Sequence, residues 1–217
     1  GAQLWAEKFD GEVEDVFDLQ DRISAEVAAA IAPEIQTAEI QRGLRKPVDN
    51  LTAYDLYLRG MHALNLGLIG EAGVRFEEAI DISPGYARAM AIRAWLTTAA
   101  HLYGFEQDGD ALRLGLDFAQ EALRLAPADA EVLGFAGYTI GFNTGDYEVS
   151  LSRLAEATRL SPSFAWAWVS QSVLASMSGR PDDAIAFADT GLRLSPRDPM
   201  AFRAYMGKAL AYMQTED

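Results

Sequence analysis

The sequence has 217 residues, half of them hydrophobic, which supplies a core for one solenoid or for one to two ordinary domains and makes disorder a poor description. Acidic residues outnumber basic ones 32 to 18, for a formal net charge of -14, and such a surface repels nucleic acid and anionic lipid. Cysteine is absent, which excludes disulfides, thiolate metal sites and cysteine catalysis.

The N-terminal segment, residues 1–46, is expected to form a short strand and a long helix. Residues 3–9 alternate in polarity before an Asp10-Gly11 turn, which is typical of a strand. Because one strand is not stable alone, it pairs with a missing domain, with a second copy, or with nothing. Apolar residues then recur on one helix face: Phe17, Ile23, Val27, Ile31 and Ile35. Residues 45–50 contain a proline and mark a boundary, with Asn50 as the expected cap of the next helix.

Targeting signals are not evident. No apolar run approaches the roughly 18 residues of a membrane-spanning helix, and residues 1–19 lack the basic-then-apolar layout of a secretory signal. The sequence therefore predicts a cytoplasmic chain. Since residue 1 opens directly onto the expected strand, we interpret the sequence as a piece of a larger protein.

A helical unit recurs along the rest of the chain. The small and large residues of its first copy have the same spacing as those of a later copy: Gly60, Ala72, Phe76, Ala79 and Pro84 against Ser172, Ala184, Ala188, Gly191 and Pro196. A period of about 34 residues is typical of helical-hairpin arrays, and insertions fall in their loops, as do about nine extra residues in the second unit. The expected units are 53–86, 87–129, 130–164 and 165–198, followed by a lone helix at 199–213.

The lone final helix is expected to have Asp198 as its cap and Pro199 as its first residue. It is either the terminal cap of the array or the first half of an interrupted fifth unit.

Small residues are expected where helices cross, and they are Gly60, Ala94, Gly137 and Ser172 in the first helices and Ala72, Gly115, Ser150 and Ala184 in the second. Each hairpin needs its neighbour to cover its apolar face.

This spacing resembles the tetratricopeptide repeat (TPR), best in residues 53–86 and in residues 165–187 with Pro196. The resemblance implies an all-α fold, a helical-hairpin solenoid wound into a right-handed superhelix over residues 51–217, preceded here by the short strand and long helix. It is specific for the fold and unspecific for the function, because such arrays bind many partners.

A second resemblance concerns residues 1–46. The words LWAEKFD and DVFDLQDRI, followed by NLTAYDLYLRG, are similar to the end of the TolB-like region of bacterial multidomain signalling proteins. In those proteins a class III adenylate or guanylate cyclase domain, or a winged-helix DNA-binding domain, lies upstream and TPR units lie downstream. Residues 1–46 are thus interpreted as the remnant of that region. This sequence lacks the cyclase metal-binding aspartates, the purine-recognition residues and the winged helix, so such activities would belong to the parent chain.

Candidate chemistry is sparse. His62 and His101 lie on different units and are expected to be packed or surface residues. The glycines at 67, 70 and 73 are followed by no Gly-Lys-Ser/Thr and preceded by no strand, so they indicate a turn rather than a phosphate loop. Gly134, Gly137 and Gly141 lie on a first helix, where close helix contact explains at least Gly137. We predict no catalytic residue, cofactor or metal site.

The expected site is the concave groove lined by the first helices. Its candidate residues are Tyr54, Tyr57, Met61, Asn65, Arg88, Trp95, Tyr138, Phe142, Trp166 and Arg203. Aromatic residues and arginine are the types that anchor interfaces, although each could instead pack against a neighbouring unit. The apolar face of residues 53–86 is expected to be partly covered, by the N-terminal helix or by a second chain.

The function predicted from these observations is a non-catalytic interaction scaffold, the regulatory region of a cytoplasmic bacterial signalling protein with a cyclase parent. Its expected partner is a protein or peptide segment, and its own upstream domain is one candidate. Neither nucleic acid nor a membrane is expected as a partner. The acidic surface favours a basic or apolar partner; a groove that captures acidic tails needs lysine, asparagine and arginine, which only Asn65 and Arg88 approximate. The alternatives are homodimerisation or domain positioning, and the TPR region of a winged-helix transcriptional regulator.

Overall fold

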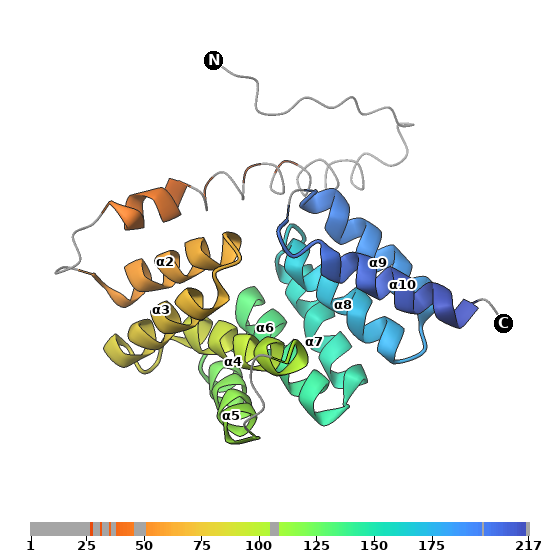
Figure 1. Cartoon of the computed structure of the whole chain (residues 1–217), viewed down its shortest axis with the longest axis horizontal. Coiled ribbons are helices and arrows are strands. Elements are labelled where there is room, and N and C mark those ends of the chain that lie inside the picture. Colours follow the sequence, from red (N-terminus) through yellow and green to blue (C-terminus); the bar gives the residue numbers. More distant parts are fainter. Residues whose placement is uncertain are drawn as a thin grey trace, which may run out of the picture.

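The computed structural model describes Val27, Ile31, Ile35 and residues 38–45, 51–104, 109–196 and 198–215. Regular secondary structure in these residues is helical throughout, in agreement with the all-α expectation. The expected strand at residues 3–9 lies outside the described residues. The helices follow one another around an arc that runs from α2 to α10 (Figure 1).

The labelled helices pack in consecutive pairs that end with a single helix. They are α2 (Ala53–Asn65) with α3 (Ile69–Ile82), α4 (Ala87–Leu102) with α5 (Gly109–Leu125), α6 (Ala130–Thr144) with α7 (Tyr147–Leu160), α8 (Ala165–Met177) with α9 (Pro181–Leu194), and α10 (Phe202–Thr215). From α4 onward the first helices also pack against one another, α4 on α6, α6 on α8 and α8 on α10. This inner row is covered by the second helices and holds most of the buried residues.

The start of α2 differs from the sequence expectation. Its N-cap is Thr52 rather than Asn50: the Thr52 hydroxyl accepts from the Asp55 backbone N–H at 3.2 Å, and the Asp55 carboxylate accepts from the Thr52 N–H at 2.9 Å. This reciprocal capping box satisfies two orphan donors at once, which a lone Asn50 cannot do. At the other end Gly67 adopts φ +74°, a left-handed conformation that glycine reaches without strain and that closes the turn into α3.

The last helix begins at Phe202 instead of the expected Pro199. The Asp198 carboxylate accepts from the Met200 N–H at 2.7 Å, and the Asp198 carbonyl accepts from the Ala201 N–H at 3.0 Å. Asp198 thus closes a tight turn first, and the α-helix starts only after that turn. Asp198 therefore caps this turn and is not the N-cap of α10, which begins three residues after the expected position.

The small residues expected at helix crossings are all buried. A Cβ added to Gly60 would lie 2.6 Å from Cε1 of Phe76, and one added to Gly137 would lie 3.0 Å from Cβ of Arg153. The Ser150 hydroxyl donates to the Gly137 carbonyl at 2.6 Å across the α6–α7 crossing. Here the sequence prediction is confirmed, because only a small side chain permits this approach of the two backbones.

Helical residues 38–44 pack on α2. Ile40 is 4% exposed, the Tyr54 hydroxyl donates to the Glu39 carboxylate at 2.6 Å, and a Cβ at Gly43 would lie 3.2 Å from Cδ1 of Leu58. The expected partial cover of the first unit by the N-terminal helix is therefore confirmed for this stretch. Ile31 and Ile35 are 47% and 57% exposed, so that part of the predicted apolar stripe stays open to solvent.

Among the helices that the structure describes, none is long and apolar enough to cross a membrane.

Candidate functional site

The ten predicted groove residues fall into three burial classes. Tyr54, Asn65 and Arg88 are exposed; Met61, Phe142 and Trp166 are partly buried; Tyr57, Trp95, Tyr138 and Arg203 are buried. The structure brings most of them into two groups on the inner helices, one around Tyr57 and one around Arg203. Met61 of α2 packs against the hydrophobic core, and Asn65 joins neither group.

The first group, the Tyr57–Glu131 cluster, consists of Tyr57, Arg88, Asp129 and Glu131 and links three units. The Tyr57 hydroxyl donates to the Glu131 carboxylate, and Arg88 donates to the same carboxylate at 3.4 Å and to Asp129 at 2.8 Å. Asp129 is also the N-cap of α6 and accepts from two backbone N–H groups at 3.0 and 3.1 Å. Every charged group of this cluster has a partner inside it, so the cluster ties α2, α4 and α6 together.

Burial alters the acidity of this cluster. It raises the pKa of the Glu131 carboxyl above its ordinary value, and the Arg88 charge and the Tyr57 hydrogen bond oppose this shift only in part. Burial and the neighbouring Glu131 charge raise the pKa of Tyr57 well above the ordinary range. At the margin, burial and the hydrogen bond to Glu39 raise the pKa of Tyr54 to about 12. The tyrosines of this region therefore act as neutral hydrogen-bond donors.

The raised pKa of Glu131 predicts a pH dependence of stability. A carboxyl with a raised folded-state pKa gives stability that is present below its ordinary pKa and lost as pH rises through the raised one. The Glu131→Gln variant lacks this ionisation, so its free energy of unfolding should increase relative to the parent as pH rises from about 4.5 toward neutrality. Urea unfolding at a series of pH values measures the difference.

Glu156→Gln is the matched control for this series. The exposed Glu156 carboxyl has a pKa lowered by its hydrogen bond to Arg159, so its contribution has the opposite sign and is lost as pH falls. Parallel pH profiles for the two variants would contradict the assignment of the effect to Glu131.

The second group, the aromatic cluster, consists of Trp95 from α4, Phe135, Tyr138 and Phe142 from α6, and Phe164 and Trp166 at the start of α8. Trp166 is its centre, with ring centroids 4.1 Å from Phe135, 5.5 Å from Trp95 and 5.8 Å from Tyr138. Edge-to-face and tilted contacts of this kind are favourable beyond the area that they bury. The rings form one continuous surface across three inner helices.

Arg203 of α10 lies against this surface and is 2% exposed. Its guanidinium carbon is 5.0 Å from the ring centroids of Tyr138 and Trp166 and 5.6 Å from that of Trp95. One nitrogen, Nη2, donates to the Ser170 hydroxyl at 3.2 Å. A desolvated cation over a ring gains on the order of 2 kcal/mol, so the rings stabilise the charge and join α10 to the three preceding inner helices.

Sequence reasoning missed part of the aromatic cluster. Phe135 was not predicted, although it lies four residues after Glu131 and three before Tyr138, so helical spacing would have placed it on the groove stripe. Phe164 precedes α8 and has no periodic signal, and serine is a residue type that is mostly exposed, so nothing indicated Ser170. The partnership of Arg203 with rings 37 to 108 residues away follows from the winding of the array and leaves no local signal in the sequence.

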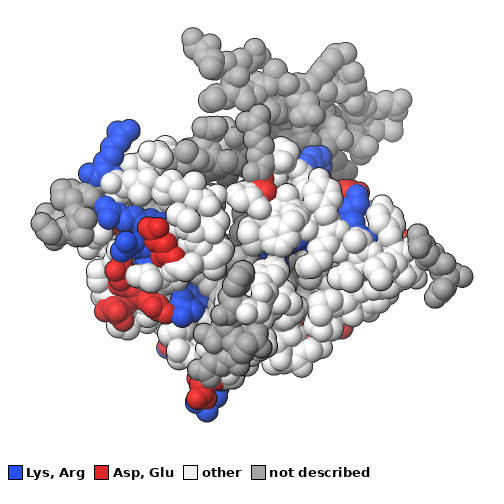
Figure 2. All heavy atoms as spheres, in the orientation of Figure 1, with Lys and Arg blue, Asp and Glu red and all other residues white. Residues whose placement is uncertain are grey.

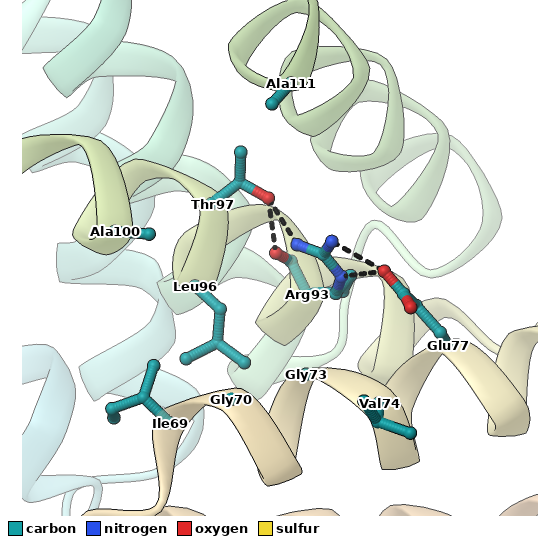
Figure 3. A pocket seen from close by; sticks show the side chains of 10 residues that line it. All are labelled: Ile69, Gly70, Gly73, Val74, Glu77, Arg93, Leu96, Thr97, Ala100 and Ala111. Carbon is teal, nitrogen blue, oxygen red and sulfur yellow. Dashed lines mark hydrogen bonds and ion pairs between the residues drawn. The ribbon is translucent and has the colours of Figure 1, made fainter. Parts of the chain in front are cut away.

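A surface pocket of about 260 Å³ lies between α3 and α4, with one wall from α5 (Figure 3). Its apolar walls include Ile69 and Leu96, and Gly70 and Gly73 leave it open along α3. On one side Arg93 pairs with Glu77 at 2.6 Å and donates to the Thr97 hydroxyl at 2.5 Å. Because Arg93 is bound to both Glu77 and Thr97, its charge is already paired on that side of the pocket.

Metal ligands do not gather in the part of the chain that the structure covers: no group of three or more histidine, aspartate or glutamate side chains there could hold a metal ion.

Comparisons with known proteins place the fold. No family model matches the sequence. The chain is similar to a thermophilic TPR protein of Thermus thermophilus, with a TM-score of 0.55 and 18% identity over 92% of this chain and 98% of that one. It is also similar to PilF of Pseudomonas aeruginosa, with a TM-score of 0.51 and 22% identity over 76% of this chain and 69% of that one. The fold is therefore that of a TPR-like array.

One curated protein is similar in sequence, a putative adenylate cyclase 3 of Rhizobium meliloti (strain 1021). The two are 28% identical over 127 residues, which is 57% of this chain and 22% of the cyclase. This chain thus spans about a fifth of the length of that relative.

Proposed function

We propose that this chain is a non-catalytic protein-interaction region, and that it regulates a cytoplasmic bacterial signalling protein with a class III adenylate or guanylate cyclase domain. The TPR-like fold supports the first part, and the similarity to a putative adenylate cyclase supports the second. Residues 51–217 would form the array, with units at 53–86, 87–129, 130–164 and 165–198 and a final helix, wound as a right-handed superhelix. Residues 1–46 would be the end of a TolB-like region.

The observation that carries the interaction role is the aromatic cluster with Arg203. Aromatic side chains and arginine dominate the binding energy of protein interfaces, and here they are collected on the inner helices. Phe142 and Trp166 are only partly buried, so the cluster reaches the solvent on that side. A partner segment with apolar side chains could extend this ring surface without large rearrangement of the array.

In-cell photocrosslinking tests the proposal. A p-benzoylphenylalanine in place of Phe142 is expected to capture the partner, because this ring lies at the solvent edge of the aromatic cluster. The same group in place of Leu114, which is 51% exposed on α5, is the control and should capture nothing specific. Equal capture from both positions, or from neither, would contradict a partner site on the inner helices.

The cyclase assignment has its own test. Deletion of residues 51–217 from the parent protein should change the nucleotide cyclase activity or its response to the partner captured at Phe142. Unchanged cyclase activity in both conditions would refute the regulatory role and leave the interaction role intact.

A second candidate function, homodimerisation, is favoured by the outer face of α10. Tyr205, Tyr212 and Met213 are 62%, 48% and 75% exposed, and the surface over α10 is largely uncharged on the face shown in Figure 2. In each of the other units, the second helix of the pair packs against the first helix. No described helix follows α10 to pack against it in this way. Sedimentation velocity decides this point, since a strict monomer at high concentration excludes the dimer.

A further inference from the structure

We propose that Arg203 and Trp166 form a binding site for a carboxylate group carried by the partner segment. This inference rests on the proposed interaction role and names the chemistry that the inner helices recognise. It also reverses one expectation from the sequence, which argued against acidic ligands because Asn65 and Arg88 alone resembled a carboxylate-binding groove.

The first observation is a buried charge for which the described residues provide no counter-ion. Arg203 is only 2% exposed. Within the described part of the chain, its hydrogen bond is to the Ser170 hydroxyl and its ring contacts are to three aromatic rings, and all four groups are neutral. Arginine is almost never fully buried without a paired anion. The site therefore has the charge of a receptor for an anion.

The second observation is a pair of unused donors. Nη1 of Arg203 and Nε1 of Trp166 are both buried, and neither has a hydrogen-bond partner among the described residues; the guanidinium carbon is 5.0 Å from the Trp166 ring centroid. A buried N–H group without an acceptor is costly. A carboxylate has two oxygens with several lone pairs, so one group can accept from both donors.

The surroundings favour a carboxylate over a phosphate. The net charge of the chain is -14, and the walls around Arg203 are aromatic, so a doubly charged group would be desolvated against a single positive charge. A singly charged carboxylate next to an apolar side chain matches both the guanidinium and the rings. Trp166 and Phe142 are partly exposed and give such a segment its route to the site.

Three dipeptides test the proposal on the full 217-residue chain. N-acetyl-Asp-Phe-amide carries only a side-chain carboxylate, N-acetyl-Asn-Phe carries only a terminal carboxylate, and N-acetyl-Asn-Phe-amide is neutral. Binding is followed by the indole N–H resonances of ¹⁵N-labelled protein, with Trp166 assigned from the Trp166→Phe variant. We expect a charged dipeptide to shift the Trp166 resonance and to bind at least about tenfold more tightly than the neutral one.

The tighter of the two charged dipeptides identifies the source of the carboxylate, an acidic side chain or a chain end. Inorganic phosphate at the same concentration should cause no comparable shift. The proposal is overturned if the neutral dipeptide binds as tightly as the charged ones, if neither charged dipeptide shifts the Trp166 resonance in the millimolar range, or if phosphate shifts it equally.

Variants separate recognition from a purely structural role. Arg203→Met keeps an apolar side chain and removes the charge, and it should lower the affinity at least about tenfold. Trp166→Phe keeps an aromatic ring and removes only the Nε1 donor; with Trp95 as reporter it should weaken the charged dipeptide several-fold and leave the neutral one unchanged. If Arg203→Met does not fold, as judged by circular dichroism, Trp166→Phe still decides, and parent-like affinity in that variant overturns the proposal.

Arg180→Met is the matched control, because this exposed arginine pairs with Asp183 on the surface at 2.7 Å. Its affinity for the dipeptides should equal that of the parent. These measurements need no physiological partner, so their failure leaves the crosslinking result at Phe142 standing, and failure of the crosslinking leaves the dipeptide result standing.

Discussion

Replacing Phe76 with alanine should lower the free energy of unfolding by about 3–5 kcal/mol, the range for truncating a fully buried phenylalanine. Phe76 is 0% exposed and lies between α2 and α3, with its ring against Gly60 and 5.9 Å from the ring of Tyr57. Because this ring fills the crossing of α2 and α3, the loss is expected in the first unit of the array. Urea denaturation followed by circular dichroism measures it.

Val74→Ala is the control for this prediction, since Val74 lies on the same helix but is 49% exposed, and its truncation should change stability by no more than about 0.5 kcal/mol. A Phe76→Ala protein that is as stable as the Val74→Ala protein would show that α2 and α3 are held together elsewhere.

Gly60 provides a sharper version of the same experiment. Its Cβ would lie 2.6–2.9 Å from three atoms of the Phe76 ring, so Gly60→Ala should destabilise the parent by about 1–3 kcal/mol through overpacking. In the Phe76→Ala background the added methyl group instead enters the cavity, and Gly60→Ala should be neutral or stabilising. A double-mutant cycle of Gly60→Ala and Phe76→Ala should therefore give a coupling energy of at least about 1 kcal/mol. Additive effects of the two substitutions on stability would contradict the direct contact.

The Gly60–Phe76 contact illustrates what the sequence could predict. The small residue at the crossing lies on the first helix of the hairpin, and the large residue lies sixteen positions later on the second helix. Because only one turn separates the two helices, this contact is local in sequence and recurs with the repeat. The same reasoning placed the helix pairs and the buried small residues. Helix starts were less predictable. Thr52 rather than Asn50 is the N-cap of α2 because Thr52 and Asp55 form two reciprocal hydrogen bonds, which depend on the final backbone geometry.

The site was predictable only in its composition. Periodicity placed Tyr138, Trp166 and Arg203 on the inner side of the array, but it could not give their burial, because burial depends on how tightly successive units wind. Arg203 of α10 contacts Trp95 of α4 across the two helix pairs α6–α7 and α8–α9, and the spacing within one repeat unit cannot predict such a contact. The sequence therefore predicted these residues as an open groove lining, whereas the structure places most of them in a largely buried aromatic cluster, with two donors that have no acceptor among the described residues.

Gly141 on α6, like Gly134, is a glycine that the repeat pattern did not explain, and the structure predicts a large effect of substitution at Gly141. A Cβ at this position would lie 1.8 Å from Oγ and 2.4 Å from Cβ of Ser150, and 2.8 Å from the backbone oxygen of Asp146. The backbone oxygen cannot rotate away, so Gly141→Ala has to push α6 and α7 apart. That movement also strains the Ser150 hydrogen bond to the Gly137 carbonyl.

We expect Gly141→Ala to be about 2–4 kcal/mol less stable than the parent, from overpacking together with a buried hydroxyl that loses its acceptor. Gly73→Ala is the matched control, because a Cβ there meets nothing within 4 Å and alanine is the better helix former by up to about 1 kcal/mol. Combining Gly141→Ala with Ser150→Gly removes two of the three clashes and should restore part of the loss. If Gly141→Ala and Gly73→Ala unfold at the same urea concentration, the α6–α7 crossing is looser than this geometry requires.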